Sequence, residues 1–416
     1  MNTNIFELST EDLRKIADKL QEKIEEGLKE DGMEIKAIPT YIYPPDPKKP
    51  IEDGKVLALD WGGKNFRASI ITFKNGEVFI EMKTRVLNAE ITAGFKPEDL
   101  HKAMAATIGE LEGLDKNVTK IGYTFSYPAK CESDGDATLI EWTKDIDIPD
   151  MVGKRVGKLL LADLNKHFSD KGIKFDSIKV INDTVACLFA GLSKVGYDSY
   201  IGLIVGTGTN MACMIPSGKI TKPTEIKDRE SGKVIINLES GNFSPDNLTA
   251  IDAQLDAKSA NEGKQKFEKA VSGKYLVEIF KLFFPDEKFE DDFDTEKMED
   301  LIFSRKGYEK VPEEQVKVAE WIRDRSALLV AASLAGVVQV IVEQEPKVKK
   351  FCLAAEGPIF WKWKKNKDDK PHYKVLVDSE LKKLLPEGVT VDIITPEMTA
   401  PNLIGAAIAA VSPSAL

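Results

Sequence analysis

The sequence is poor in the two residue types that most often mark metal and redox sites. Its 416 residues include only four cysteines and three histidines. The cysteines are far apart, so no Cys-x-x-Cys pair predicts a zinc or redox centre, and we expect buried thiols at Cys131, Cys187, Cys213 and Cys352. No candidate motif lies near the histidines, which are His101, His167 and His372. If the protein performs acid–base chemistry, its base is therefore expected to be a carboxylate.

An excess of positive charge is also missing. The formal net charge is −10, which disfavours general binding to nucleic acid or to an anionic membrane. The opening residues, "MNTNIFELSTEDLRKIADKL", lack the basic start and apolar core of a signal peptide. No stretch approaches the roughly 20 apolar residues that span a bilayer. These absences predict a cytoplasmic protein without a nucleic-acid or membrane partner.

The length and the patterns that are present predict an α/β protein of two domains. A chain of 416 residues with a hydrophobic fraction of 42% is globular and too long for one compact core. Ser9 caps an amphipathic helix that ends near Gly32. Further helices are expected at 96–111, 152–168, 184–192, 270–284, 326–344 and 400–411, and strands at 56–59, 66–73, 78–84, 120–125, 177–181 and 350–355.

The clearest similarity between the two halves of the chain is a pair of hairpins with glycines at their tips, one in each half. The first reads "VLALDWGGKNFRASIITF" over 56–73, and the second reads "YIGLIVGTGTNMACMI" over 200–215. Backbone N–H groups at such turns can form an anion site, so two tips across a cleft could grip one polyphosphate. The alternative is two ordinary hairpins that need glycine for a positive φ.

Seven motifs occur in an order and spacing that resemble the hexokinase family. They are "LALDWGGKNFR", "GYTFSYP", "WTK", "INDTVA", "IGLIVGTGTNMACM", "INLESG" and "SANEGKQKFEKAVSGKYLVEI", and the similarity covers nearly the whole chain. The resemblance implies two actin-like, ribonuclease-H-like α/β domains, with mixed sheets flanked by helices, closing over a central cleft. We expect a small domain at 54–186 with the C-terminal helix 400–416. A large domain would follow at 187–399, with the N-terminal helix and linker 1–53 packed on it.

The resemblance also implies which residues bind and activate a sugar. Asp183 in "INDTVA" is expected to be the general base that accepts the proton of the sugar hydroxyl, whereas without the resemblance it would be read as a helix cap. Lys144 is expected to support the charge of the transferring phosphoryl group. The implied sugar-binding set is Ser126, Thr143, Lys144, Asn182, Asp183, Asn210, Glu239 and Glu268, with Gln265 as an addition.

ATP is the co-substrate that the resemblance implies, together with Mg²⁺. The nucleotide is expected along the two glycine tips and near a third glycine turn, at Asp60, Gly62, Gly63, Lys64, Asn65, Arg67, Gly206, Thr207, Gly208 and Gly357. Phosphate and water are expected to hold the Mg²⁺, with no direct protein ligand and with Asp60 and Asp183 reaching it through water.

The chain departs from the family pattern at four places outside the expected sugar contacts. Lys64 replaces a threonine, Ser240 replaces a tryptophan, Glu356-Gly357 replaces Asp-Gly, and "TAPNLIGAA" replaces a glycine-rich turn. These changes bear on the phosphoryl donor. The implied activity is transfer of the γ-phosphoryl group of ATP to the 6-hydroxyl of glucose, with mannose and fructose as open alternatives.

Three other functions fit parts of this pattern. A catalytically weak sugar sensor on the same fold would have lost Asp183 or Lys144, and both are present. An actin-like or chaperone-like ATPase would share the two hairpins but would lack the sugar-binding set. A sugar-responsive DNA repressor would carry an additional helix-turn-helix segment, and the acidic balance also disfavours it. A sugar kinase with a donor other than ATP stays open, as does the choice between monomer and homodimer.

Overall fold

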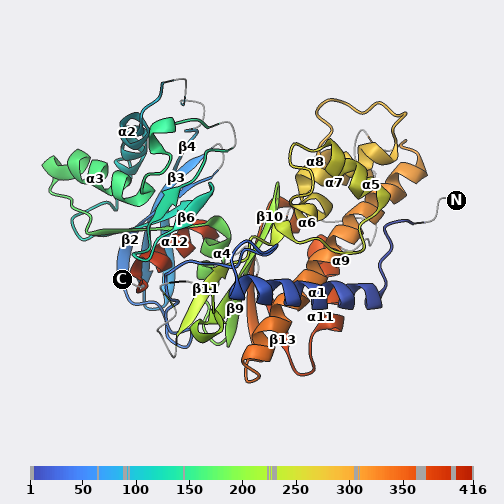
Figure 1. Cartoon of the computed structure of the whole chain (residues 1–416). Coiled ribbons are helices and arrows are strands. Elements are labelled where there is room, and N and C mark those ends of the chain that lie inside the picture. Colours follow the sequence, from blue (N-terminus) through green and yellow to red (C-terminus); the bar gives the residue numbers. More distant parts are fainter. Residues whose placement is uncertain are drawn as a thin grey trace.

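Two mixed β-sheets with helices between and around them make up the protein (Figure 1). The structure is a computed structural model. It describes residues 4–62, 65–87, 91, 94–143, 146–222, 224, 226, 232–303, 308, 310–361, 372–394 and 400–414. The expected α/β class, with two sheets flanked by helices, is confirmed over these residues.

The smaller sheet comes from the first half of the chain and has five strands. The strand order is β4(Glu77–Arg85), β3(Phe66–Lys74), β2(Gly54–Trp61), β5(Lys120–Phe125) and β8(Ser177–Ile181). β2, β3 and β4 form an antiparallel meander, and β5 and β8 run parallel to β2. One face of this sheet packs on α2(Pro97–Ile108) and α3(Val156–Phe168). A two-stranded ribbon, β6(Ala129–Cys131) and β7(Ala137–Leu139), follows β5.

The larger sheet repeats this topology in the second half. Its order is β1(Ile38–Pro39), β11(Lys233–Asn237), β10(Thr209–Pro216), β9(Ser199–Val205), β12(Lys350–Glu356) and β13(Thr390–Ile394). β9, β10 and β11 form the meander, and β12 and β13 run parallel to β9. Apart from the added edge strand β1, both sheets therefore have the same strand order and directions. The sequence similarity between the two hairpins therefore corresponds to the same sheet topology in both halves of the chain.

Two helices, α4(Asp183–Gly191) and α12(Pro401–Val411), lie between the sheets. α4 follows the last strand of the smaller sheet but packs on the larger one, whereas α12 follows the larger sheet and packs on β5, β2 and β8 of the smaller one. A Cβ at Gly405 of α12 would lie 1.8 Å from the carbonyl oxygen of Ala186. A Cβ at Gly122 of β5 would lie 1.9 Å from that of Ala406. Only glycine permits these approaches.

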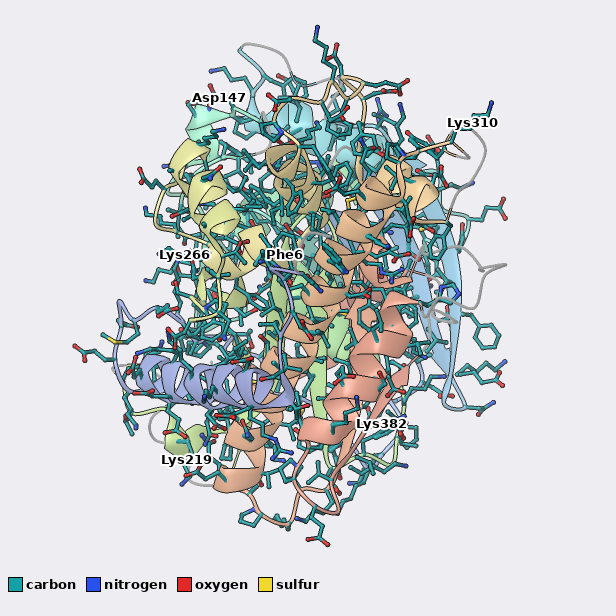
Figure 2. The ribbon with its side chains drawn as sticks, turned by 90° about the vertical axis from the view of Figure 1, so that its right-hand side faces the viewer. Phe6, Asp147, Lys219, Lys266, Lys310 and Lys382 are labelled. Atoms are coloured by element: carbon teal, nitrogen blue, oxygen red, sulfur yellow. The ribbon has the colours of Figure 1, made fainter. Side chains whose placement is uncertain are left out.

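The remaining helices pack on the larger sheet or on one another. They are α1(Thr10–Lys29), α5(Ala250–Lys258), α6(Lys266–Val271), α7(Gly273–Phe283), α8(Thr295–Ile302), α9(Glu313–Gln344), α10(Pro358–Trp361) and α11(Tyr373–Leu384). Figure 2 shows α1 lying across α9. At the start of α1, Ser9 and Asp12 form a capping box, which confirms the expected cap.

Two expectations about helices are wrong. The apolar stretch 270–284 is two helices, because Ser272 is extended and the N–H of Gly273 donates to the carbonyl oxygen of Gly206 at 2.8 Å. In addition, α9 is long and apolar enough to cross a membrane by length and composition, contrary to the expectation that no stretch approaches this length. Of its most apolar window, 78% is buried in the structure, where the helix forms part of the core.

The pattern of contacts supports the domain division that we propose. Segment 1–53 contributes α1, which packs on α9, and β1, which joins the larger sheet. We assign 54–186 together with 400–416 to the small domain and 187–399 to the large domain, because α12 packs on the smaller sheet.

Candidate active site

A cavity of about 1500 Å³ lies between the two sheets. Its walls come from both halves of the chain: residues after β5 and β8 form one side, and the β9–β10 turn, the end of β11 and α5 to α7 form the other. Eight members of the expected sugar-binding set line it: Ser126, Thr143, Asn182, Asp183, Asn210, Glu239, Gln265 and Glu268. The ninth, Lys144, lies outside the described residues.

Asp183 is positioned by the junction between β8 and α4. Asn182 is the N-cap of α4, and its Oδ1 accepts the N–H of Thr184 at 2.9 Å. Oδ1 of Asp183 accepts the same N–H at 2.8 Å. Within the described part of the chain, Oδ2 of Asp183 has no hydrogen-bond partner. Since Asn182 holds the N-cap position, the aspartate faces the cavity with one oxygen available.

Glu268 lies against the second glycine turn. Its Oε2 accepts the N–H of Thr209 at 3.1 Å, and a Cβ at Gly208 would lie 2.6 Å from the same oxygen. Burial raises the pKa of Glu268, against the lowering effect of the Thr209 N–H. A side chain at position 208 would therefore displace this carboxylate from its present place. None of Gly62, Gly206 and Gly208 has a positive φ, so a left-handed backbone does not explain these three glycines.

The residues expected to bind nucleotide divide into two groups. Gly206, Thr207, Gly208 and Gly357 line the cavity, whereas Asp60, Gly62, Asn65 and Arg67 are described but do not line it. Gly63 and Lys64 lie outside the described residues. Asp60 is buried and forms an ion pair with Arg67, its cross-strand neighbour in the β2–β3 hairpin.

Two glycines allow close packing within each half of the site. A Cβ at Gly62 would lie 2.2 Å from Cβ of Ser126, so the first hairpin tip packs directly on a sugar-site residue. Gly357 has φ of +109°, and a Cβ there would lie 2.2 Å from the carbonyl oxygen of Val205. The turn after β12 is thereby held against the second hairpin.

Glu356 adds a carboxyl group to the cavity wall beside Gly357. Burial raises the pKa of Glu356 to about 7, against the charge of Arg67 and with added repulsion from Asp60 and Asp183. This part of the cavity therefore holds a carboxyl group whose charge changes near neutral pH. No group of three or more His, Cys, Asp or Glu side chains suited to a metal ion occurs among the described residues.

The sequence reasoning missed many polar residues of the cavity wall, among them Asn237, Asn261 and Lys274. Nδ2 of Asn261 donates to Oε1 of Gln265 at 2.6 Å and orients that amide. Asn237 is the last residue of β11, and Glu239 follows two residues later, just beyond the strand. That spacing was available in "INLESG", although the partner strand was not. Cys131 also lines the cavity and is partly exposed, while the other three thiols are buried as expected.

Sequence models described as "Hexokinase" match residues 2–192 and 200–288. Hexokinase-1 of Spinacia oleracea is 30% identical, and the alignment covers 97% of this chain and 88% of that protein. The chain belongs to the hexokinase family. The solved structure of a Schistosoma mansoni hexokinase complexed with glucose gives a TM-score of 0.74 at 25% identity, covering 98% of this chain and 96% of that one.

A second solved hexokinase structure gives a TM-score of 0.76 at 25% identity, covering 97% of this chain and 96% of that one. The predicted family and its two-domain fold of mixed sheets flanked by helices are thereby confirmed. Some sequence alignments are partial. The curated hexokinase of Schistosoma mansoni is 34% identical over 66% of this chain, which spans 61% of that protein.

Proposed function

We propose that this hexokinase-family protein is an ATP-dependent hexose kinase, transferring the γ-phosphoryl group of ATP to the 6-hydroxyl of glucose. One observation carries the proposal. A single cavity contains Asp183 with an available carboxylate oxygen, a wall of amide, hydroxyl and carboxylate groups, and the Gly206–Gly208 turn. Such groups suit a ring of sugar hydroxyls, and a glycine turn suits a phosphate chain.

Asp183 acts as the general base in this proposal. The proton of the sugar 6-hydroxyl passes to its Oδ2 as the hydroxyl oxygen bonds to the γ-phosphorus and the bond to the β-phosphate oxygen breaks. The transition state of phosphoryl transfer is loose, so the base accepts the proton late and need not be strong. Asn182 keeps the aspartate from serving as the helix cap. Lys144 is proposed to stabilise the phosphoryl charge, although it lies outside the described residues.

The residues present fit a magnesium–nucleotide complex whose metal depends on phosphate and water. When bound, Mg²⁺ neutralises charge on the β- and γ-phosphates. Asp183 is proposed to face its water shell. Asp60 is proposed to do so as well, although it pairs with Arg67 and does not line the cavity. The N–H of Gly206 donates to the carbonyl oxygen of Gly208 at 2.9 Å, so the N–H groups of Thr207 and Gly208 are proposed to face the phosphate oxygens. Gly357 is proposed to approach the adenosine.

Two alternatives share this cavity. A sugar sensor would bind hexose without transfer, and a kinase for another donor would transfer phosphate from a nucleotide other than ATP or from inorganic polyphosphate. Glu356 is a reason to test donors other than ATP, because it places a carboxyl group beside Gly357, where the nucleotide is proposed to bind. Mannose and fructose are alternative acceptors. We also propose a cytoplasmic location with no nucleic-acid or membrane partner, as monomer or homodimer.

Phosphorylation of a hexose panel by a donor panel tests the proposal. Transfer to glucose from ATP is expected, and absence of transfer to any hexose from any donor would refute it. Asp183→Ala and Asp183→Asn are expected to lower kcat by about 10²- to 10⁴-fold while glucose binding persists. Asp163→Asn, which alters a carboxylate paired with His101 between α2 and α3, is the control. Retention of kcat in the Asp183 variants would refute the assignment of the base.

A further inference from the structure

Asn237, the last residue of β11, lies between two residues of the proposed sugar site. It is 6% exposed and lines the cavity. Its Oδ1 accepts a hydrogen bond from Nδ2 of Asn210 at 2.7 Å. Its Nδ2 donates to Oε1 of Glu239 at 2.7 Å. A buried amide therefore connects an amide on β10 with a carboxylate beyond β11.

The direction of this connection is set by the backbone. Oδ1 of Asn210 accepts the N–H of Met211 at 2.7 Å and the N–H of Ser240 at 3.1 Å. Because a backbone N–H can only donate, the Asn210 amide must present its oxygen to these groups and its nitrogen to Asn237. Asn237 must then accept from Asn210, which leaves its own nitrogen facing Glu239. Reversing either amide would place two donors or two acceptors together.

Glu239 depends on such support because its backbone is unfavourable. It has φ of 55° and ψ of 45°, a left-handed conformation that is strained for a residue other than glycine. With Oε1 engaged by Asn237, Oε2 has no hydrogen-bond partner among the residues described here. One carboxylate oxygen is thus fixed by the protein, and the other is left for a ligand hydroxyl.

We propose that Asn237 is a positioning residue for the sugar: it transmits the fixed orientation of Asn210 to Glu239 and directs Oε2 of Glu239 into the cavity. This inference rests on the proposed function, since the ligand of Oε2 is the hexose. The bond from an amide N–H to a carboxylate is charge-assisted, so it is among the stronger bonds a neutral side chain can make. Loss of Asn237 should weaken sugar binding without altering the nucleotide side of the cavity.

A charge exchange tests the direction of the network. Asn237→Asp places two carboxylates together and removes the donor to Glu239, so the Kd for glucose should rise at least 30-fold. In the double variant Asn237→Asp with Glu239→Gln, the Gln amide can donate to the new aspartate. We expect this pair to bind glucose at least fivefold more tightly than Asn237→Asp alone. Binding is measured by calorimetry and by intrinsic tryptophan fluorescence, because Trp142 directly precedes Thr143, which lines the cavity.

Asn237→Ala, which introduces no like charge, covers the case in which Asn237→Asp does not fold, and its Kd for glucose should rise about 10-fold. KM for ATP should stay within twofold of wild type in each folded variant. Asn165→Ala is the matched control, since Asn165 of α3 also uses both ends of its amide, on the N–H and the carbonyl oxygen of Phe175. It should lower Tm without changing glucose binding.

The outcomes separate this inference from the function on which it rests. If wild type binds no hexose, the proposed function fails and the inference fails with it. If wild type binds glucose and Asn237→Ala stays within threefold, only the inference is overturned. It is also overturned if the double variant binds glucose no more tightly than Asn237→Asp. If Asn237 had only a structural role, exchanging the donor and acceptor between positions 237 and 239 would not restore glucose binding.

Discussion

Substitution of Gly405 by alanine should damage catalysis from a position that touches no ligand. The new Cβ would lie 1.8 Å from the carbonyl oxygen of Ala186, 2.6 Å from its carbonyl carbon and 2.9 Å from its Cα. Cβ atoms in real structures essentially never approach another heavy atom closer than 3.0 Å. Helices α12 and α4 would therefore have to separate by more than about 1 Å at their crossing, at an overpacking cost of roughly 1–3 kcal/mol.

The displacement should reach Asp183 because Ala186 belongs to the first turn of α4. The N–H of Ala186 donates to the carbonyl oxygen of Asn182 at 2.9 Å, so the start of the helix moves with it. A shift of about 1 Å in a catalytic group can cost about 100-fold in rate. We expect Gly405→Ala to lower kcat by about that factor and Tm by several degrees, measured by coupled assay and scanning calorimetry.

Gly336→Ala is the control for this reasoning. It introduces a Cβ 2.6 Å from the carbonyl oxygen of Ala17, where α9 crosses α1 away from the cavity. This variant should lose stability with kcat within about threefold of wild type. The reasoning is refuted if Gly405→Ala keeps kcat within threefold of wild type. It is also refuted if the loss of kcat for each degree of lowered Tm is as large in Gly336→Ala as in Gly405→Ala.

Three further predictions concern buried charges. Burial lowers the pKa of Lys179 to about 8 from 10.5; the unfolded chain therefore holds more protons between these values, and stability rises with pH there. Lys179→Met removes this buried charge and also the hydrogen bond to Ser412, so the net gain in the free energy of unfolding should be about 1–2 kcal/mol at pH 7. Denaturant titrations should show that the gain disappears near pH 10.5. Glu356 ionises as pH rises through about 7, so KM for ATP should increase over that range through repulsion of phosphate, and a Glu356→Gln variant with the same pH profile as wild type would contradict this. Arg325→Leu should cost about 3–5 kcal/mol in denaturant titrations, because Asp252 would lose its buried bidentate partner, and replacing both residues with apolar ones should recover most of that loss.

Features set by neighbours in sequence could be predicted, and those set by distant contacts could not. The Ser9 cap of α1 and the first hairpin depend on residues a few positions apart, and both were predicted. The break at Ser272 depends on Gly206, which is remote in sequence, so the apolar pattern of 270–284 looked like one helix. Strands β11 and β13 were likewise missed, because short strands are defined by the partners with which they pair.

The site shows the same division. Motif resemblance identified Asp183, Glu239 and Glu268, all of which line the cavity. It gave no reason to select Asn237, since the role of this residue appears only when β10 and β11 are paired and the Asn210 amide is fixed. Nothing in the sequence indicated the contact at Gly62, where a Cβ would lie 2.2 Å from Cβ of Ser126 at the end of the neighbouring strand.

The position of α12 has a consequence for the order in which a newly made chain can fold. The hydroxyl of Thr124 in β5 donates to the carbonyl oxygen of Asn402, across a separation of 278 residues. At about 5–20 residues per second, a ribosome needs roughly 15–55 s to make the intervening segment. During that time the inner face of the smaller sheet, with its glycine at Gly122, has no helix to cover it. The nascent small domain is therefore the part of this protein for which a chaperone has the longest opportunity to bind.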